Sequence, residues 1–262
     1  MNRVAFNIFG FNVYYYSLCI LLGVIVAYIL ITREGKKQGL PKEFISDLIF
    51  YTLIIGILGA RVYYCVFNLD YYLANPSEIL KIYNGGLAIH GGVIAGLIFV
   101  YFYTKKKNFS FIKILDMVAP AVIIAQSFGR WGNFFNQEAH GGITTYQNLK
   151  NMHIPEFIIN GMHIEGKYYY PTFFFESIWC LIGFIILMIA RRNKNLRKGF
   201  QIGFYFIWYG IGRFFIEAFR TDSLMFFGLK IAQIVSLIGI IIGIIIIVTN
   251  RNKKYYNEME VK

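Results

Sequence analysis

Charged residues are scarce in this 262-residue chain, at 15% against about 25% in typical soluble domains. Hydrophobic residues make up 57% and aromatic residues 19%, so the composition excludes a disordered chain, a collagen and an ordinary soluble fold. The three cysteines, Cys19, Cys65 and Cys180, lie inside apolar runs, and their spacing fits neither paired disulfides nor a metal site. We expect them to be inert packing thiols.

Acidic residues are few relative to basic ones, which gives a formal net charge of +12 and a pI of about 9.5. Such a charge is often the mark of a nucleic-acid-binding protein. The mean hydropathy of +0.52 argues against that interpretation, because a basic groove for nucleic acid needs a water-soluble body to carry it. We therefore predict no nucleic-acid partner.

Several cofactor and metal patterns are missing from the sequence. It contains no P-loop, no Rossmann glycine fingerprint and no HExxH zinc motif. His140, His153 and His163 are too scattered to indicate a metal site and are expected to be solvated loop residues. We predict neither a cofactor nor a bound metal.

Long apolar runs dominate what is present. A spanning helix needs about 20 predominantly apolar residues, and the sequence offers about seven such segments. We therefore predict an all-α polytopic membrane protein with about seven transmembrane helices. The positive cluster of Arg33, Lys36 and Lys37 follows the first segment instead of preceding it, so we expect this segment to stay as an anchor and not to be a cleaved signal peptide. The segments are Val13–Thr32, Phe44–Phe67, Leu87–Tyr103, Ile114–Phe128, Thr172–Ala190, Phe200–Phe219 and Leu229–Thr249.

The loops between these segments differ sharply in charge. Seventeen of the 26 Lys and Arg residues fall in alternate loops, within 33–42, 105–113, 191–198 and 251–262, and six fall in the other set. Cytoplasmic loops carry the excess of Lys and Arg, which predicts an outside N-terminus and a cytoplasmic C-terminus. No internal repeat or low-complexity linker is visible, so we predict one integral membrane domain over 1–262 with an external excursion at 139–170.

Charged and polar residues inside the apolar segments share one depth. Tyr16, Arg61, His90, Arg130, Glu176 and Arg213 all fall toward the outer leaflet in this topology. An Arg at a helix centre costs about 2.5–3.5 kcal/mol on insertion scales, so each deep charge needs a reason. Arg213 and Glu217 could simply neutralise one another, but Tyr205, Tyr209, Arg213 and Glu217 recur at i+4 on one face. This pattern predicts a polar cavity open to the outer side.

Two segments concentrate polar chemistry. Gly129–Gly141 contains Arg130, Asn133, Asn136 and Glu138; it could be an interfacial cap anchored by Trp131, although a cap does not need so many polar groups. His90 lies between glycines at 85–92, where a structural histidine is the simpler interpretation. Imidazole titrates near neutrality, so His90 is also a candidate base.

Ordered motifs along most of the chain resemble one family. Residues 129–141 carry Arg130, Asn133-Phe134, Asn136, Glu138 and Gly141, and residues 85–92 read Gly-Gly-Leu-Ala-Ile-His-Gly-Gly. Together with further matches they resemble the bacterial prolipoprotein diacylglyceryl transferases. Tyr16, in Tyr-Tyr-Tyr-Ser in place of the more usual Trp-Tyr-Gly, matches a first-span tyrosine. The further matches are Gly59-Ala60-Arg61-Val62-Tyr63-Tyr64, Pro171-Thr172 followed by Glu176, and Tyr209-Gly210-Ile211-Gly212-Arg213 with Glu217 and Arg220.

The resemblance implies an enzyme of the bacterial cytoplasmic membrane with its active site toward the outer leaflet. Such enzymes move a diacylglyceryl group from phosphatidylglycerol to the lipobox cysteine of a preprolipoprotein signal peptide and release glycerol 1-phosphate. The partners implied are these two substrates and the lipid bilayer. The substrate supplies its own thiol nucleophile.

The same resemblance suggests roles for individual residues. Arg130 and Arg213 are expected to clamp the departing phosphate, since guanidinium groups match phosphate oxygens. His90 is expected to deprotonate or orient the thiol. Arg61 is either another phosphate contact or a structural charge. Tyr209 and Tyr16 are expected to position the phosphate or the glycerol. Asn133, Asn136 and Glu138 are expected to bind the head group or to hold the arginines. Gly141 and Glu217 complete the expected site.

Two other classes of protein fit part of the pattern. An anion channel or transporter also suits an arginine-lined cavity, but it predicts polar residues continuing to the inner face. The inner halves of these segments are largely Ile, Leu, Val and Phe. A structural scaffold would leave the clustered Arg and His without a purpose.

Overall fold

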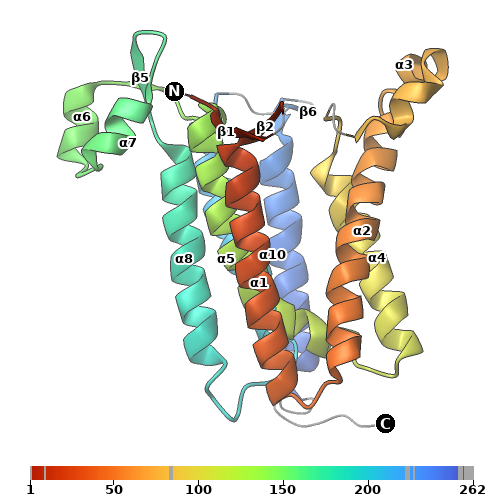
Figure 1. Ribbon diagram of the computed structural model, residues 1–262. Coiled ribbons are helices and arrows are strands. Elements are labelled where there is room, and N and C mark those ends of the chain that lie inside the picture. The colour runs from red at the N-terminus through yellow and green to blue at the C-terminus, as the bar shows by residue number, and fades with distance from the viewer. Residues whose placement is uncertain are drawn as a thin grey trace. The chain divides into compact units, whose positions relative to one another are not determined.

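Long helices account for most of the computed structural model, which describes residues 2–8, 10–82, 85–221, 225–226, 228–252 and 256 (Figure 1). The described residues contain seven helices of 18 or more residues, and each contains most of one predicted apolar segment. The all-α prediction is therefore confirmed. These helices are α1 (Tyr15–Lys37), α2 (Lys42–Val66), α4 (Ile89–Lys106), α5 (Phe111–Asn136), α8 (Thr172–Ala190), α9 (Phe200–Phe219) and α10 (Ile231–Asn250).

Five of these helices, α1, α2, α5, α8 and α10, are long and apolar enough to cross a membrane. The chain is thus a multi-pass membrane protein. Helix α4 has 18 residues and ends on Lys105 and Lys106, while α9 carries Arg213 and Glu217. A total of seven spans, an outside N-terminus and a cytoplasmic C-terminus stay predictions.

Short elements fill the connections between the long helices. Strands β1 and β2 form an antiparallel hairpin before α1, and β6 pairs with β7 before α10. Between α5 and α8, a three-stranded sheet of order β3-β5-β4 accompanies two short helices. The bounds are β1 (Val4–Ile8), β2 (Phe11–Tyr14), α3 (Leu69–Ala74), η1 (Pro76–Leu80), β3 (Ile143–Thr144), α6 (Tyr146–Asn151), α7 (Glu156–Gly161), β4 (His163–Ile164), β5 (Lys167–Tyr169), β6 (Met225–Phe226) and β7 (Leu229–Lys230).

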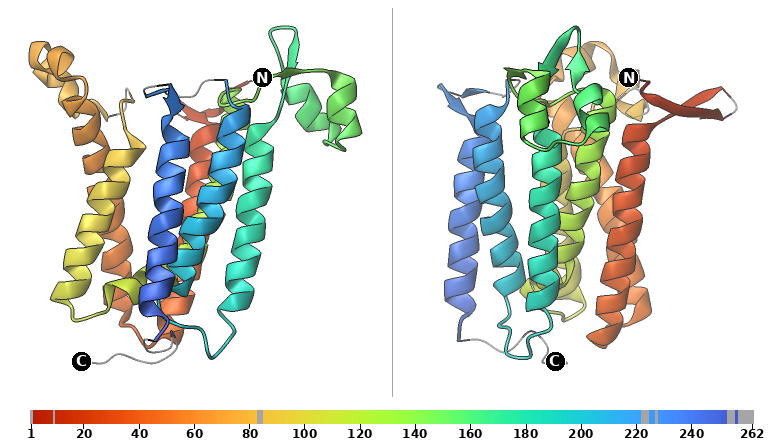
Figure 2. Two further views of the ribbon diagram at one scale, coloured as in Figure 1. Left: turned by 180° about the vertical axis from the view of Figure 1, so that it is seen from behind. Right: turned by 90° about the vertical axis from the view of Figure 1, so that its left-hand side faces the viewer.

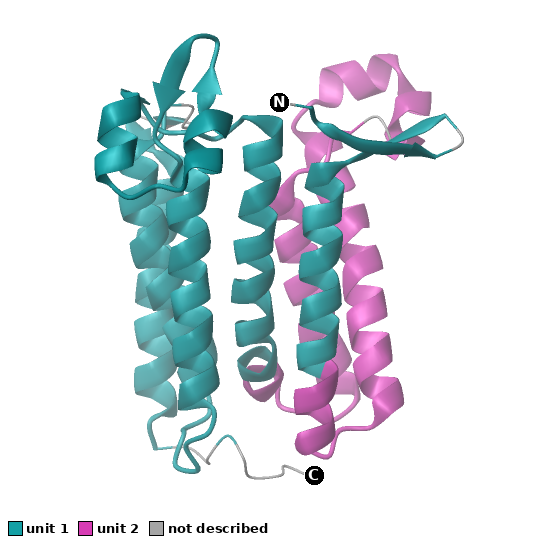
Figure 3. Cartoon of the chain, turned by 60° about the vertical axis from the view of Figure 1, so that its left-hand side comes forward, with its two compact units in different colours: residues 1–31, 115–258 teal, residues 32–114, 259–262 magenta. Residues whose placement is uncertain are grey.

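Two compact units make up the chain (Figure 3). The first combines residues 1–31 with 115–258, and the second is formed mainly by residues 32–114. Helices α8, α9 and α10 belong to the first unit together with most of α1 and α5, whereas α2 and α4 form the second. A single domain over 1–262 remains a prediction.

Helices α9 and α10 lie side by side in the first unit because glycines face one another across their contact (Figure 2). A Cβ atom built on Gly243 would fall 2.5 Å from the carbonyl oxygen of Gly203, and one on Gly203 would fall 2.8 Å from that of Gly243. Membrane helices lack a hydrophobic drive toward each other, so small residues that allow close backbone approach hold them together.

Helix α8 is joined to α9 by two tryptophans. The rings of Trp179 and Trp208 stack with centroids 4.2 Å apart. Trp179 Nε1 donates to the carbonyl oxygen of Trp208 at 2.8 Å, and Trp208 Nε1 donates to that of Trp179 at 2.9 Å. This reciprocal pair satisfies both indole N–H groups within the packed helices.

Pro120 inside α5 allows a contact between this helix and Arg191, which follows α8. Proline has no N–H, so the carbonyl of Asp116 loses its helical donor. Arg191 Nη2 donates to the Asp116 carbonyl at 3.0 Å and to that of Met117 at 2.9 Å. The Asp116 carboxylate accepts the main-chain N–H groups of Gly199 at 2.5 Å and Ile202 at 2.9 Å, which caps the start of α9.

The predicted excursion at 139–170 is folded onto the ends of α5 and α8. Leu149, Ile158, Ile159 and Met162 from α6, α7 and the turn after α7 are buried in one cluster with Phe134 and Phe173 from the long helices. Burial of these apolar side chains fixes the excursion to the helices that carry the polar motifs.

Alanine substitutions at two glycines of α10 separate packing from helix propensity. We expect Gly243→Ala to lower the thermal unfolding midpoint in detergent, because overpacking costs about 1–3 kcal/mol and exceeds the gain of up to about 1 kcal/mol in helix propensity. Gly239→Ala is the matched control, since the nearest atom lies 3.9 Å from its Cβ position. Equal midpoints for the two variants would contradict the close approach of α9 and α10.

Candidate active site

Three helices of the first unit bring three predicted polar side chains around one carboxylate. Glu176 lies in the second turn of α8. Its Oε1 atom is 2.8 Å from Nη2 of Arg130, which lies near the end of α5. Its Oε2 accepts a hydrogen bond from Arg213 Nη1 of α9 at 3.1 Å. Tyr209 accepts from Arg130 Nη2 at 3.1 Å and donates to Glu176 Oε1 at 3.1 Å. Glu176 is thus shared by α5 and α9.

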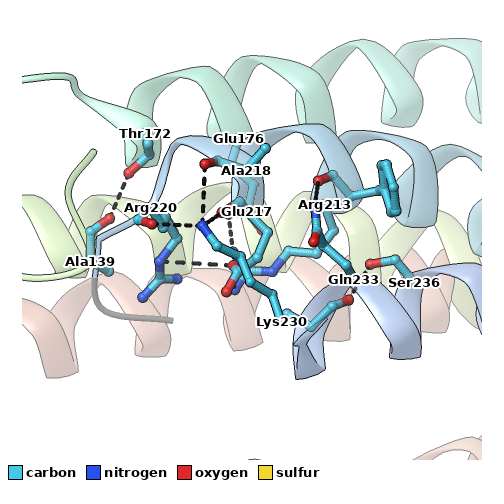
Figure 4. A network of polar contacts seen from close by, with 12 residues as sticks. Ala139, Thr172, Glu176, Arg213, Glu217, Ala218, Arg220, Lys230, Gln233 and Ser236 are labelled. Carbon is cyan, nitrogen blue, oxygen red and sulfur yellow. Dashed lines mark hydrogen bonds and ion pairs between the residues drawn. The ribbon is translucent and has the colours of Figure 1, made fainter. Parts of the chain in front are cut away.

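A second carboxylate extends the cluster along α9 (Figure 4). Glu217 Oε2 lies 2.5 Å from Arg213 Nη2 and 3.9 Å from Arg220 Nε. Lys230 Nζ donates to the carbonyl oxygens of Glu217 at 2.7 Å, Ala218 at 3.2 Å and Arg220 at 2.8 Å. These carbonyls end α9, and a cation is favoured at the C-terminal end of a helix. The predicted Arg213–Glu217 pair therefore exists, as part of a larger network.

The acids of this network are more deeply buried than its arginines. The side chains of Glu176 and Glu217 are each 3% exposed, whereas Arg130, Arg213 and Arg220 are 23%, 15% and 13% exposed. Three guanidinium groups and two carboxylates leave a net positive charge in the cluster. An anion that approaches would meet the guanidinium groups before the carboxylates.

Arg130 keeps hydrogen-bonding capacity for a ligand. Within the described part of the chain, its contacts with Glu176 and Tyr209 both use Nη2. A guanidinium group carries five N–H donors, so donors at Nε and Nη1 stay available. This is the geometry that a planar fork needs to bind two oxygens of one anion.

The polar residues after Arg130 form a compact turn around Glu138. Asn133 and Asn136 donate from their amides to Glu138 Oε1 at 3.0 and 3.2 Å. Helix α5 ends at Asn136, and Gln137 and Ala139 both have positive φ. Glu138 thus orders the two asparagines, and it makes no hydrogen bond or ion pair to Arg130 among the described residues.

Gly141 links this turn to the end of α9. Its N–H donates to the carbonyl of Tyr170 at 2.9 Å, and it forms a β-bridge with Arg220. A Cβ atom on Gly141 would lie 2.8 Å from Tyr170 Cβ. Close packing explains why a glycine stands here.

Tyr16 lies against the same end of α5. A Cβ atom on Gly132 would fall 2.5 Å from Tyr16 Cδ2, so α1 and α5 are in close contact beside Arg130. Tyr15 stacks on Phe135 with ring centroids 4.6 Å apart. Tyr16 therefore lies in the same unit as the arginine cluster.

Arg61 belongs to the second unit and is buried there. Its guanidinium donates to the carbonyl oxygens of Ile79 at 2.9 Å, Gly85 at 2.8 Å and Gly86 at 2.9 Å, and also to that of Glu78. It also stacks over the ring of Tyr72 at 5.2 Å. Backbone carbonyls from the segment between α3 and α4 occupy most of its donors.

His90 also belongs to the second unit, in the first turn of α4. The side chain is exposed, and its ring centroid lies 6.5 Å from that of Tyr63. Gly91 allows α4 to approach α2, since a Cβ atom there would collide with Gly59 O and Tyr63. The imidazole is thus accessible at the end of a closely packed helix pair.

One central residue was absent from the predicted site. Glu176 was expected at the outer depth and belongs to one of the family motifs, but no part in binding or catalysis was predicted for it. A lone carboxylate in an apolar helix must be paired, and this rule indicates that Glu176 has a cationic partner without saying which residue it is.

The fold and this cluster define a multi-pass membrane protein in which partly exposed arginines surround two buried carboxylates. The family model of the prolipoprotein diacylglyceryl transferases matches residues 3–249. A phosphatidylglycerol–prolipoprotein diacylglyceryl transferase from Bacillus cereus strain G9842 is 48% identical over 96% of this chain and 93% of its own length. Proteins of the same name from Bacillus thuringiensis subsp. konkukian strain 97-27 and Bacillus anthracis strain CDC 684 are 48% and 47% identical over the same shares. The chain belongs to the prolipoprotein diacylglyceryl transferase family.

Removal of the shared charge should weaken the contacts among the three helices. We expect Glu176→Gln to lower the free energy of unfolding by about 3 kcal/mol, because two guanidinium groups lose a buried partner. Lys81→Gln is the control: it breaks an exposed pair with Glu78, worth at most about 1 kcal/mol. Thermal unfolding in detergent measures both, and similar losses for the two variants would refute the central role of Glu176.

Proposed function

We propose that this protein transfers the diacylglyceryl group of phosphatidylglycerol to the lipobox cysteine of a preprolipoprotein. Family membership supports the reaction, and the observation that carries it is the arginine cluster around Glu176. We also propose that the site faces the outer leaflet of a bacterial cytoplasmic membrane. The excess of basic residues in the opposite loops supports this orientation.

The reaction needs a thiolate and a phosphate leaving group. The cysteine sulfur attacks the glyceryl carbon that carries the phosphate ester, a C–S bond forms, and the C–O bond to phosphate breaks. The products are a thioether-linked diacylglyceryl protein and glycerol 1-phosphate, which takes the bonding electron pair. Negative charge therefore grows on the phosphate as the bond breaks, and cations placed there lower the barrier.

Arg130 and Arg213 supply these cations in our proposal. Both are fixed by Glu176, so little reorientation is needed when the phosphate charge develops. The remaining N–H donors of Arg130 would bind phosphate oxygens, and Tyr209 would position the phosphate or the glycerol next to them. Tyr16 has the same proposed role from α1, where it lies against the end of α5.

The turn after α5 would bind the glycerol head group. Asn133 and Asn136 are held by Glu138, and amide groups suit hydroxyl groups because they both donate and accept hydrogen bonds. Glu217 keeps Arg213 in position, and Gly141 leaves room for the chain to pass close to Arg220.

We propose that His90 takes the proton of the cysteine thiol. Histidine is the side chain that most often serves as a general base, and the side chain of His90 is exposed at the start of α4. Arg61 has a structural role in this proposal, since backbone carbonyls and Tyr72 surround its guanidinium group.

Arginine geometry is tested by charge-conserving variants. We expect Arg130→Lys and Arg213→Lys each to lower the rate of thioether formation by about 10²-fold, because an ammonium group cannot bind two oxygens as a fork. The assay uses the purified full chain in phosphatidylglycerol vesicles with a lipobox peptide. Arg192→Lys, at an exposed loop residue, is the control. Full activity in both site variants would show that the clamp is wrong.

The role of His90 is tested through the pH dependence of the rate. We expect His90→Asn to lower the rate by about 10²–10⁴-fold at neutral pH and to change the pH profile of the rate, because the general base is lost. His163→Asn, in the excursion between α5 and α8, is the matched control. If His90→Asn kept both the rate and its pH profile, His90 would be a structural residue.

The same preparation discriminates against an anion channel or transporter. A transferase yields the thioether product without anion flux across the vesicle membrane. Anion flux with no thioether product under varied conditions would replace the proposed function.

A further inference from the structure

A second polar pair joins α5 to α9 one helical turn away from the contact between Arg130 and Tyr209. Gln126 precedes Arg130 by four residues on α5. Tyr205 precedes Tyr209 by four residues on α9. Gln126 Nε2 donates to the Tyr205 hydroxyl at 3.0 Å, in the way that Arg130 Nη2 donates to the hydroxyl of Tyr209. This pair lies about 5.4 Å farther from the helix ends that carry the arginines.

The rings of Tyr205 and Tyr209 form one stack on an apolar support. They are nearly parallel, with an interplanar angle of 7° and centroids 6.0 Å apart. Both pack on the buried cluster of Ile123, Cys180 and Leu187. Each hydroxyl is therefore the polar tip of an apolar ring, and the two tips meet α5 one turn apart.

The pair of Gln126 and Tyr205 has hydrogen-bond donors to spare. The Tyr205 hydroxyl accepts from the Gln126 amide, and among the described residues its own hydrogen and the second amide hydrogen have no acceptor. With the amide in the opposite orientation, Tyr205 donates to its oxygen and both amide hydrogens are left. Two donors are thus unused in either orientation. Both side chains are partly exposed, and a donor beside apolar side chains is costly without an acceptor.

The ligand that fits two spare donors is a group that accepts hydrogen bonds and donates none. An ester carbonyl is such a group, and the diacylglyceryl part of phosphatidylglycerol carries its ester carbonyls a few bonds from the phosphate, toward the hydrocarbon chains. With the phosphate at Arg130, the ester carbonyls would lie on the side of Gln126 and Tyr205. The order of groups along the lipid therefore matches the order of side chains along α5 and α9.

We propose that Gln126 and Tyr205 bind an ester carbonyl of the diacylglyceryl group while Arg130 holds the phosphate. This inference rests on the proposed function and adds a subsite to it. Two contacts on one glyceryl group fix the depth of the carbon between them, which is the carbon that the thiolate attacks. Such positioning of a reacting atom contributes directly to the rate.

Substrates with and without ester carbonyls test the subsite. A dialkyl ether analogue of phosphatidylglycerol keeps the phosphate and the glyceryl carbons but lacks the carbonyls. Thioether formation is measured with the purified full chain, a lipobox peptide and each lipid at matched chain length in nonionic detergent micelles. We expect the wild type to have a kcat/KM about fivefold higher for the diacyl lipid, which is the worth of one hydrogen bond of about 1 kcal/mol.

The variants separate a lipid contact from helix packing. Tyr205→Phe keeps the ring stack and should lower the preference for the diacyl lipid about threefold or more, and Gln126→Leu/Tyr205→Phe should bring it close to one. Tyr28→Phe removes a hydroxyl from an exposed tyrosine of α1 and should keep the wild-type preference. Native mass spectrometry with the two lipids gives the same ratio for a variant without measurable turnover.

Two results would overturn the subsite. One is equal use of the diacyl and dialkyl lipids by the wild type. The other is an equal loss of activity or binding on both lipids in Tyr205→Phe, because the pair would then only hold α5 on α9. A wild type that forms no thioether from either lipid would instead overturn the proposed function, and this inference with it.

Discussion

A buried carboxylate that needs positive partners controls the arrangement of the first unit. An ionised group removed from water is stable only when it is paired and hydrogen-bonded. Glu176 on α8 meets this requirement with Arg130 from α5 and Arg213 from α9, and no single helix could supply both. The same interaction therefore joins three helices and fixes two guanidinium groups. The ion pairs of Glu176 therefore determine both how the three helices pack and where the positive charges of the cluster lie.

At the other end of the same helices, buried polar groups are also paired, but here the partners include main-chain groups. Pro120 leaves the carbonyl of Asp116 without its helical donor, and Arg191 replaces that donor. The Asp116 carboxylate in turn caps α9. Between these two polar ends, the stacked Trp179 and Trp208 pack without charges, and Gly203 faces Gly243 where α9 packs on α10. Ion pairs and capping bonds thus fix the two ends of these helices, while ring stacking and close backbone approach join the helices without charges.

Much of the fold could be predicted from the sequence because membrane solvation acts locally. An apolar run of sufficient length marks a helix whatever its neighbours are, and each predicted run lies largely within one long helix. The i+4 spacing of Tyr209, Arg213 and Glu217 likewise placed them on one face, and they join one network. Both inferences need only the geometry of a single helix.

Other features depend on contacts between distant segments and left no local signal. Glu176 pairs with residues 46 positions before it and 37 after it, so its partners follow only from the packing of three helices. Arg61 resembles a ligand-binding arginine in the sequence, yet its partners are backbone carbonyls, which every residue carries. The folding of 139–170 onto Phe134 and Phe173 is likewise a product of tertiary burial.

The pairing of the arginines bears on turnover as well as on stability. A guanidinium cluster without acids would bind a phosphate product about as strongly as it stabilises the departing charge, and product release would then limit the rate. Glu176 and Glu217 lie behind the arginines and offset part of their charge. The guanidinium groups remain more exposed than these acids, and in the proposed reaction the charge on the phosphate grows only as the ester bond breaks. In the proposed reaction, such compensation favours the transition state over tight retention of glycerol 1-phosphate.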